Sequence, residues 1–280
     1  MAIYPVIAEH WKMDGGAAFG VVPQTIWRKM ALPDENNMIR ITNRCLLVVD
    51  GKRRILFDTG MGNKQSSKYY GFRYLFGNES LEKSLKLRGL EAHDITDVVF
   101  THLHDDHCGG AVKLDKDGKP EPVFKNAMHY CSSGQWEWAN HPNSREAGSY
   151  FKINFLPLEQ AGMLSFFDKP GLFSENIRLV QMNGHTQGQL IPIISHNGYT
   201  FVFTADFIPT AAHIPLPFVP SVDISPLESL REKEIFLEEA VENNYLLVFE
   251  HDFDVECCTL QRTEKGIRMD KLCLLDEFLN

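Results

Sequence analysis

Residues 101–110 read Thr-His-Leu-His-Asp-Asp-His-Cys-Gly-Gly. They continue from the apolar run Asp97 to Thr101, which predicts a buried strand. The stretch gathers three histidines and two aspartates within six positions. His102 and His104 point the same way if strand geometry continues for one more residue, and Gly109-Gly110 lets the backbone bend beside them. Without a cation such a cluster would be repulsive and desolvated, whereas neutral imidazoles and carboxylates are the usual zinc ligands. The stretch therefore predicts a metal site at the end of a strand rather than a solvated polar loop.

Three more residues of metal-ligand type occupy similar places further along the chain. His185 lies in a glycine-flanked loop after a predicted strand, 177–182. Asp206 and His251 come directly after two other apolar runs. Because α/β folds place their sites at the ends of buried strands, these three residues are candidates for the same site.

The order of these residues resembles the metallo-β-lactamase superfamily. The pattern His-x-His-x-Asp-His stands at 102–107, and a separate His, Asp and His follow it in the family's order. Phe57-Asp58-Thr59-Gly60 matches the first family motif, and Gly184-His185-Thr186 matches the Gly-His-Thr motif. The five motifs span residues 58–251. The resemblance implies an α/β fold, a four-layer αβ/βα sandwich in which two mixed β-sheets face each other, helices lie outside and the metal site lies at one edge.

The resemblance also implies a dinuclear metal centre. Carried over residue by residue, one metal ion would be held by His102, His104 and His185, the other by Asp106, His107 and His251, and Asp206 would bridge both. The cofactors implied are two divalent metal ions, zinc first, with manganese, iron or cobalt as alternatives. Asp58 would lie outside the ligand set and orient a histidine through its far nitrogen. A hydroxide shared by the two ions would attack the substrate, and Asp106 would relay a proton to the leaving group.

Within the superfamily, the chain is most similar to the lactonase and organophosphate-hydrolase branch, which includes N-acyl homoserine lactonases and methyl parathion hydrolase. The similarity lies in segments 14–23 and 205–213. It implies hydrolysis of a lactone, an ester or a related small-molecule bond. Some lactonases carry a substrate-binding Tyr three residues after the bridging Asp, where this chain has Pro209. His213 is a candidate polar contact in its place, or an ordinary surface histidine.

Other activities of the same fold are weighed against the motif details. Glyoxalase II shares the ligand set and cleaves thioesters, but its C-terminal helical part is reduced here to residues 252–280. A mononuclear iron sulfur-dioxygenase would leave one metal position empty, which the joint presence of Asp206, His107 and His251 disfavours. Flavo-diiron oxidoreductases usually have Glu at the position of His104, and the nucleases want a basic surface. A metal-binding scaffold without turnover is disfavoured because no ligand is missing.

Several apolar residues near the expected mouth of the site are candidates for an acyl or aryl pocket, with core packing as the alternative. They are Phe19, Val21, Val22, Trp27, Met61 and Phe207. Trp136 and Trp138 alternate as they would in a strand, which predicts packing residues or a pocket rim.

The composition predicts one globular domain, residues 1–280. Of the 280 residues, 44% are hydrophobic and 23% are charged, which supports a large core and excludes disorder, collagen and coiled coil. No repeat, low-complexity tract or Gly/Ser linker divides the chain. Hydrophobic patterning predicts strands at 44–49, 54–57, 97–101, 177–182, 190–195, 199–205 and 245–249, and helices at 80–88, 225–243 and 267–278.

The net charge of −9 disfavours nucleic acid or an anionic membrane as the main partner, since both need a basic footprint. A small-molecule substrate is the expected partner, and a homodimer is left open. The N-terminus has no signal-peptide pattern, and no stretch approaches the roughly 18 apolar residues of a membrane span. The six cysteines are scattered, which favours reduced thiols and a cytoplasmic location.

Overall fold

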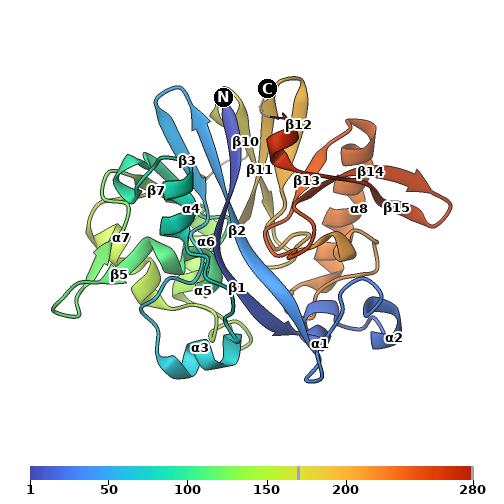
Figure 1. Ribbon diagram of the computed structural model, residues 1–280, viewed down its shortest axis with the longest axis horizontal. Helices are drawn as coiled ribbons and strands as arrows, with labels where there is room; N and C mark the ends of the chain where they lie inside the picture. The colour runs from blue at the N-terminus through green and yellow to red at the C-terminus, as the bar shows by residue number, and fades with distance from the viewer. Residues whose placement is uncertain (169–170, 279–280) are drawn as a thin grey trace. The chain divides into compact units, whose positions relative to one another are not determined.

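The computed structural model describes residues 1–168 and 171–278, and the chain divides into two compact units (Figure 1). Unit 1 consists of Met1–His10 and Asn43–Lys169, and unit 2 of Trp11–Thr42 and Pro170–Asn280. Two of the boundaries fall inside the strands β1 and β2, so each of these strands contributes residues to both units. The single-domain organisation expected from the sequence stays a prediction.

Unit 1 contains a mixed six-stranded sheet of order β1-β2-β3-β4-β7-β8, whose first two strands continue along the chain into residues of unit 2. Strands β2 and β3 pair antiparallel, whereas β3, β4, β7 and β8 run parallel to one another. The strands are β1 (Ala2–Asp14), β2 (Met38–Asp50), β3 (Arg53–Phe57), β4 (Asp97–Val99), β7 (Met128–Cys131) and β8 (Leu164–Phe166), with a separate pair β5 (Val112–Leu114) and β6 (Pro120–Pro122). The helices are α3 (Ser67–Arg73), α4 (Leu81–Leu87), α5 (Asp105–Cys108), α6 (Ser133–Asn140) and α7 (Leu156–Gln160), with short 3₁₀ turns at Ala92–Asp94, Gly109–Ala111 and Lys152–Asn154.

The parallel pairing of β3 and β4 places their carboxyl ends side by side. Phe57 is in register with Val99, and the backbone N–H of Asp58 donates to the carbonyl of Val99 at 3.1 Å. Both strands are fully buried at these positions, as their apolar side chains require. The residues that follow them, Asp58 and the 101–107 stretch, therefore emerge at the same edge of the sheet.

Unit 2 contains a mixed seven-stranded sheet of order β15-β14-β13-β12-β11-β10-β9, and helix α8 lies beside β14 and β15 (Figure 1). Only β12 and β13 pair in parallel, and the other neighbours are antiparallel. The elements are α1 (Gly15–Phe19), α2 (Gln24–Trp27), β9 (Gly171–Ser174), β10 (Ile177–Met182), β11 (Gln189–His196), β12 (Tyr199–Phe203), α8 (Pro226–Glu242), β13 (Leu246–Val248), β14 (Cys257–Thr263) and β15 (Gly266–Cys273), with 3₁₀ turns at Ala211–His213 and Leu275–Phe278. Since Phe203 is in register with Val248, the segments that carry Asp206 and His251 leave the sheet at the same edge.

The predicted α/β class with two mixed sheets is confirmed, and most of the predicted elements are present. The helix expected at 267–278 is wrong: this segment forms β15 and a short 3₁₀ turn. Gly266, with φ 91°, turns the chain so that β15 pairs with β14, and this pairing overrides the helical spacing of its apolar residues. The strand-like alternation of Trp136 and Trp138 is also wrong, because Ser132 caps a helix there by accepting the N–H of Gln135 at 3.0 Å.

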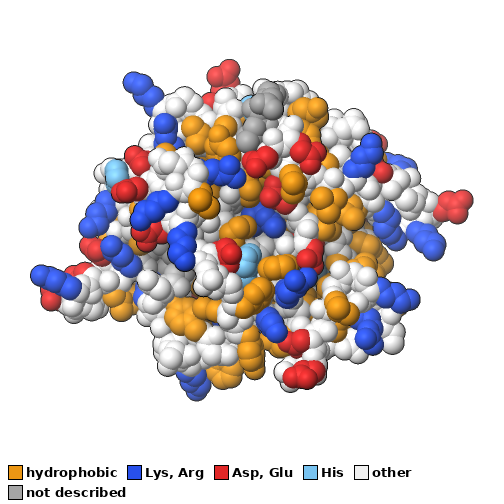
Figure 2. All heavy atoms as spheres, in the orientation of Figure 1, with side chains coloured by type: hydrophobic (Ala, Val, Ile, Leu, Met, Phe, Trp, Pro, Cys, Tyr) orange, Lys and Arg blue, Asp and Glu red, His pale blue; other side chains and the backbone are white. Residues whose placement is uncertain are grey.

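Charged side chains of both signs are interspersed over the face shown in Figure 2. Although the net charge is −9, the acidic side chains on that face do not form a patch separate from the basic ones. Among the described residues, no helix combines the length and the apolar character that crossing a membrane demands.

His129 of β7 is expected to make unit 1 sensitive to acid. Its Nδ1 donates to the carbonyl of Met163 at 3.2 Å, its Nε2 has no hydrogen-bond partner among the described residues, and burial lowers its pKa to about 4. The unfolded chain takes up this proton near pH 6.5, so the stabilisation is complete above that pH and is lost as the pH falls toward 4. At pH 5 the loss amounts to about 2 kcal/mol from this group.

Urea denaturation at pH 7 and pH 5 tests this expectation. His129→Gln removes the titrating group, so the variant should lose about 2 kcal/mol less than the wild type between the two pH values. His141→Gln, at a histidine whose side chain is 79% exposed in the same unit, should behave like the wild type. An equal pH dependence in wild type and His129→Gln would contradict the assignment.

Candidate metal-binding clusters in the two units

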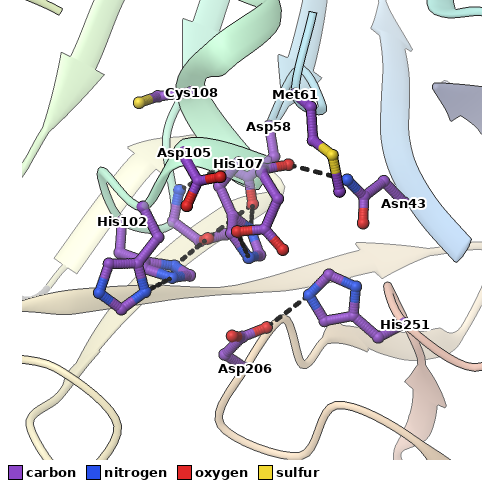
Figure 3. A network of polar contacts seen from close by, with 12 residues as sticks. Asn43, Asp58, Met61, His102, Asp105, His107, Cys108, Asp206 and His251 are labelled. Carbon is purple, nitrogen blue, oxygen red and sulfur yellow. Dashed lines mark hydrogen bonds and ion pairs between the residues drawn. The ribbon is translucent and has the colours of Figure 1, made fainter. Parts of the chain in front are cut away.

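Asp58 holds together the cluster of unit 1. Its backbone has φ 60°, a left-handed conformation that is rare outside glycine and is concentrated at functional sites. The buried carboxylate accepts the backbone N–H of Thr101 at 2.8 Å and the Thr101 hydroxyl at 2.6 Å. It also lies 3.1 Å from Nδ1 of His107 (Figure 3). The side chain predicted to orient a histidine is therefore in hydrogen-bond contact with one.

The contact with Asp58 determines which nitrogen of His107 is available to a ligand. A carboxylate only accepts, so Nδ1 of His107 carries the hydrogen. In the neutral imidazole, Nε2 then presents its lone pair. That nitrogen lies 3.8 Å from the carboxylate oxygen Oδ1 of Asp106. Two electron-rich atoms thus face each other in a buried position.

His102 and His104 repeat this arrangement. The Thr101 hydroxyl donates to Asp58, so it accepts from Nδ1 of His102, 3.1 Å away. Nε2 of His104 lies 3.3 Å from Oε1 of Glu146, whose other oxygen accepts from Trp138 at 2.6 Å. The remaining nitrogens, Nε2 of His102 and Nδ1 of His104, are 2.9 Å apart. Both present lone pairs at this distance, which is repulsive unless a proton or a metal cation lies between them.

Two glycines let the chain pack tightly behind the cluster. A Cβ on Gly110 would meet the carbonyl oxygen of Thr59 at 2.1 Å, and one on Gly109 would meet that of Met61 at 2.2 Å. The close approach is fixed by the N–H of Thr59, which donates to the carbonyl of His107 at 2.7 Å. The Gly-Gly pair is therefore required by packing against the 59–61 turn.

Asp206 is the centre of the cluster in unit 2. Its Oδ1 lies 2.7 Å from Nε2 of His251 (Figure 3), and its Oδ2 lies 3.1 Å from Nε2 of His185. The far nitrogens are also engaged: Nδ1 of His185 contacts Asp223 at 2.9 Å, and Nδ1 of His251 contacts the carbonyl of Thr42 at 3.0 Å. Both of these acceptors take an N–H from Nδ1, so each ring, when neutral, directs its Nε2 lone pair at the carboxylate of Asp206, and a second proton or a cation must lie between them.

The donor chemistry of both clusters fits divalent metal ions. Five imidazoles each use one nitrogen on an oxygen atom of the protein and aim the other at a potential ligand. This is the pattern of histidines that bind metals, where the second hydrogen bond fixes the tautomer and orientation. Nitrogen and carboxylate oxygen together suit zinc, manganese, iron and cobalt. Unit 1 brings together four of the predicted ligands and unit 2 brings together three: His102, His104, Asp106 and His107, then His185, Asp206 and His251.

The structure adds an ion pair beside the predicted ligands that the sequence did not indicate. Asp105 accepts from the hydroxyl of Tyr69 and from Arg73 at 2.7 Å, both on α3. Burial and the neighbouring charge of Asp106 raise the pKa of Asp105, and the guanidinium of Arg73 opposes that rise. Asp105 thus links α3 to α5 instead of joining the ligands. Tyr69 and Arg73 lie 36 and 32 residues upstream, where no local spacing signals the contact.

His213 has a structural place and not the surface or substrate-facing one expected from the sequence. It is 2% exposed, its Nδ1 lies 2.7 Å from the Thr210 hydroxyl, and its Nε2 lies 2.9 Å from the carbonyl of Ala18. Burial lowers its pKa to about 3, so the ring is neutral. It stacks on Phe19, which in turn stacks on Trp27. These three rings form part of the packed interior of unit 2.

The other candidate pocket residues divide between interior and surface. Phe207 packs edge-on against Phe236 of α8, and Val21 is 94% exposed. Met61 is buried and borders a cavity of about 620 Å³ that lies wholly within unit 1. Of the six candidates, five are therefore buried and Val21 is exposed.

Asp58→Asn is expected to weaken metal binding about 10- to 100-fold, the usual scale for losing a partner behind a ligating histidine. The amide keeps the shape of the side chain and tolerates the left-handed backbone, but it removes the charge that holds Nδ1 of His107. Zinc affinity by competition with a chromophoric chelator measures the effect. Asp115→Asn, in an exposed turn of the same unit, is the control. Equal affinities in all three proteins would reduce Asp58 to a turn residue.

A family model described as the metallo-beta-lactamase superfamily matches residues 41–241. The solved structure of a probable metal-dependent hydrolase from Staphylococcus aureus is 29% identical to this chain, with a TM-score of 0.88, and the match covers 98% of this chain and 96% of that one. The dizinc quorum-quenching lactonase AidC, solved with the product N-hexanoyl-L-homoserine, is 21% identical, with a TM-score of 0.79 and coverage of 97% and 94%. The hydrolase AbOPH of the beta-lactamase superfamily is 18% identical, with a TM-score of 0.80 and the same coverage. At these last two identities the likeness shows the fold alone.

Proposed function

Since this chain belongs to the metallo-β-lactamase superfamily, we propose that it is a metal-dependent hydrolase that cleaves a lactone, an ester or a related small-molecule bond. The observation that carries the proposal is the set of five buried imidazoles, each with one nitrogen on a protein oxygen and the other aimed at a ligand. Nothing but a cation, or a proton on each ring, relieves the repulsion between such lone pairs and carboxylates.

The ligand assignment follows the motif order of the family. We assign His102, His104 and His185 to one divalent ion, Asp106, His107 and His251 to a second, and Asp206 to both. When bound, such ions lower the pKa of water toward neutrality and polarise a carbonyl or phosphoryl oxygen. Zinc is favoured by the nitrogen-rich donor set.

The side chains around the ligands orient them and move protons. Asp58 and Glu146 each hold the far nitrogen of an imidazole, which fixes its direction. Asp106 lies in the first turn of α5 and is nearly buried, so its carboxylate is held in place where it can pass a proton to a leaving alkoxide. No serine or cysteine nucleophile is needed for this chemistry.

The candidate substrates follow from the lactonase-like segments of the chain and from Pro209. The lactonase branch is supported by the fold shared with AidC and by segments 14–23 and 205–213. Pro209, where some lactonases have a Tyr, has no hydroxyl to offer a substrate, and its carbonyl accepts the backbone N–H of His251 at 3.2 Å. The chain therefore lacks one substrate contact of those lactonases at this position, so aryl esters and phosphotriesters belong beside lactones as candidate substrates.

A substrate panel tests the proposal directly. Protein reconstituted with zinc is assayed against N-acyl homoserine lactones, aryl esters, thioesters and phosphotriesters, with the metal-free protein as the blank for each. Metal-dependent turnover of a lactone or an ester is the expected result. Exclusive turnover of thioesters would favour the glyoxalase II alternative. No turnover in any class would contradict the proposal.

The number and kind of metal ions distinguish the second alternative. Elemental analysis of the purified protein should find close to two divalent ions per chain. One iron and no second metal would favour a mononuclear sulfur-dioxygenase instead. The assay for that activity, persulfide-dependent oxygen consumption, should then be positive while ester hydrolysis is absent.

A further inference from the structure

We infer that Asp223, held by Ser229 of α8, is a positioning residue that fixes the tautomer and direction of His185; its effect on metal binding rests on the proposed function. Oδ1 of Asp223 accepts from Nδ1 of His185 at 2.9 Å. Oδ2 of the same carboxylate accepts the hydroxyl of Ser229 at 2.6 Å. All three residues are at most 4% exposed, so water does not compete for these contacts.

The backbone keeps Asp223 and His185 in fixed register. The N–H of Ile224 donates to the carbonyl of His185 at 3.1 Å, and that of Ser225 donates to the carbonyl of Gly184 at 2.9 Å. The segment that carries Asp223 therefore runs along the His185 loop. The carboxylate is placed opposite one imidazole nitrogen by these bonds and not by chance contact of two mobile side chains.

Helix α8 fixes the same loop in a second, separate way. A Cβ on Gly184 would meet the Cα of Ser229 at 2.4 Å, so the helix backbone packs directly on the glycine. Glu232, one turn further along α8, accepts the backbone N–H groups of Asn183 at 2.8 Å and Gly184 at 3.0 Å. Glu232 thus holds the loop backbone, whereas Asp223 holds the imidazole itself.

Glu232 and Asp223 therefore differ in what their removal would change. Removing the side chain of Glu232 would break two hydrogen bonds to the loop backbone. It would not change which nitrogen of His185 carries the hydrogen, because Asp223 would still accept from Nδ1. Removing Asp223 leaves the loop bonded but frees the ring to place its hydrogen on Nε2, the nitrogen that faces Asp206 at 3.1 Å. An imidazole in that tautomer offers no lone pair to a cation there. Ser229 acts through Asp223, because its single hydrogen keeps the carboxylate in its rotamer.

The tautomer of His185 can be read in metal-free protein, independently of any activity. Long-range ¹H–¹⁵N spectra of histidine-labelled protein are recorded at increasing pH until the His185 signals stop shifting, so that the ring is observed in its neutral form, and His185→Gln identifies its signals by their loss. The wild type should show the Nδ1–H form. Asp223→Ala should shift His185 substantially to the Nε2–H form, and Asp223→Asn should restore Nδ1–H because its amide oxygen still accepts. Ser229→Ala, which removes only one hydroxyl, should shift the tautomer in the same direction by less, and it keeps the test open if Asp223→Ala fails to fold.

Zinc affinity of the same proteins supplies the second readout. Asp223→Ala should bind zinc about 10- to 100-fold more weakly, with partial rescue in Asp223→Asn, while Glu234→Ala, at an exposed position of α8, should match the wild type. An unchanged tautomer in both Asp223→Ala and Ser229→Ala overturns the inference, as does unchanged zinc affinity in Asp223→Ala. If the wild type binds no zinc, the proposed function fails, and the tautomer spectra still decide the role of Asp223.

Discussion

Asp206→Ala protein is expected to lose metal ions and at least about 100-fold in turnover, beyond the usual cost of losing a residue behind the ligands. The carboxylate of Asp206 is the common partner of His185 and His251, with oxygen–nitrogen distances of 3.1 and 2.7 Å. Its removal takes away the negative charge that would neutralise divalent ions bound beside both rings. Elemental analysis and the rate on the best substrate of the panel, measured on the same preparation, check both losses.

The control for this prediction is Asp270→Ala, which removes an exposed carboxylate from the same unit and should leave metal content and turnover unchanged. Metal binding in this fold is also linked to folding, so the melting temperature of Asp206→Ala should respond less to added zinc than that of the wild type. Full metal content with normal turnover in the variant would remove Asp206 from the ligand set.

Chelation is expected to abolish activity, and added zinc, manganese or cobalt to restore it to different degrees. The three metals differ in Lewis acidity and preferred geometry, so equal recovery with all three is not expected. A rate that stays at its starting value after complete removal of the metals would contradict metal-dependent hydrolysis. The measurement is the rate before chelation, after dialysis and after each addition.

Cys108 is the thiol nearest to the ligand motif in sequence, and the chelation experiment is therefore repeated in Cys108→Ala. The thiol is fully buried, donates to the carbonyl of Leu103 at 3.3 Å, and has its pKa raised to about 12 by burial. A thiol in that state does not form the reactive thiolate near neutral pH. The variant should thus keep its activity and its sensitivity to chelator. Turnover that survives chelation in Cys108→Ala would contradict metal-dependent hydrolysis.

The sequence predicts the candidate metal ligands well where a motif of histidines and aspartates has few roles other than metal binding. The histidine-rich 102–107 stretch, the Gly-His-Thr motif and the strand-end Asp206 could be found because imidazoles and carboxylates are costly to gather without a ligand. Asp58 could be found through its strand-turn motif. The structure brings each of these residues together with its neighbours inside its own unit.

The residues behind the ligands could not be found in the same way. Glu146 and Asp223 are single acidic residues in irregular segments, and only the fold brings them to an imidazole. From the sequence, His213 is a candidate substrate contact or a surface histidine, because nothing local signals that Thr210 and Ala18 would occupy both of its nitrogens. The 267–278 segment shows the same limit for secondary structure, since its pairing with β14 decides its conformation.

The hydrogen bonds on the far nitrogens of the five imidazoles imply that the ligands are preorganised. Each ring is already turned and its tautomer already selected by an oxygen of the protein, so little conformational entropy remains to be lost when an ion arrives. The same selection directs the lone pairs of the neutral His102 and His104 rings toward each other at 2.9 Å, a repulsion that either a shared proton or a metal ion relieves. Ion uptake relieves that repulsion, which makes the melting temperature a gauge of metal loading: at a free ion concentration 100 times the Kd, the folded state gains about 2.7 kcal/mol per site.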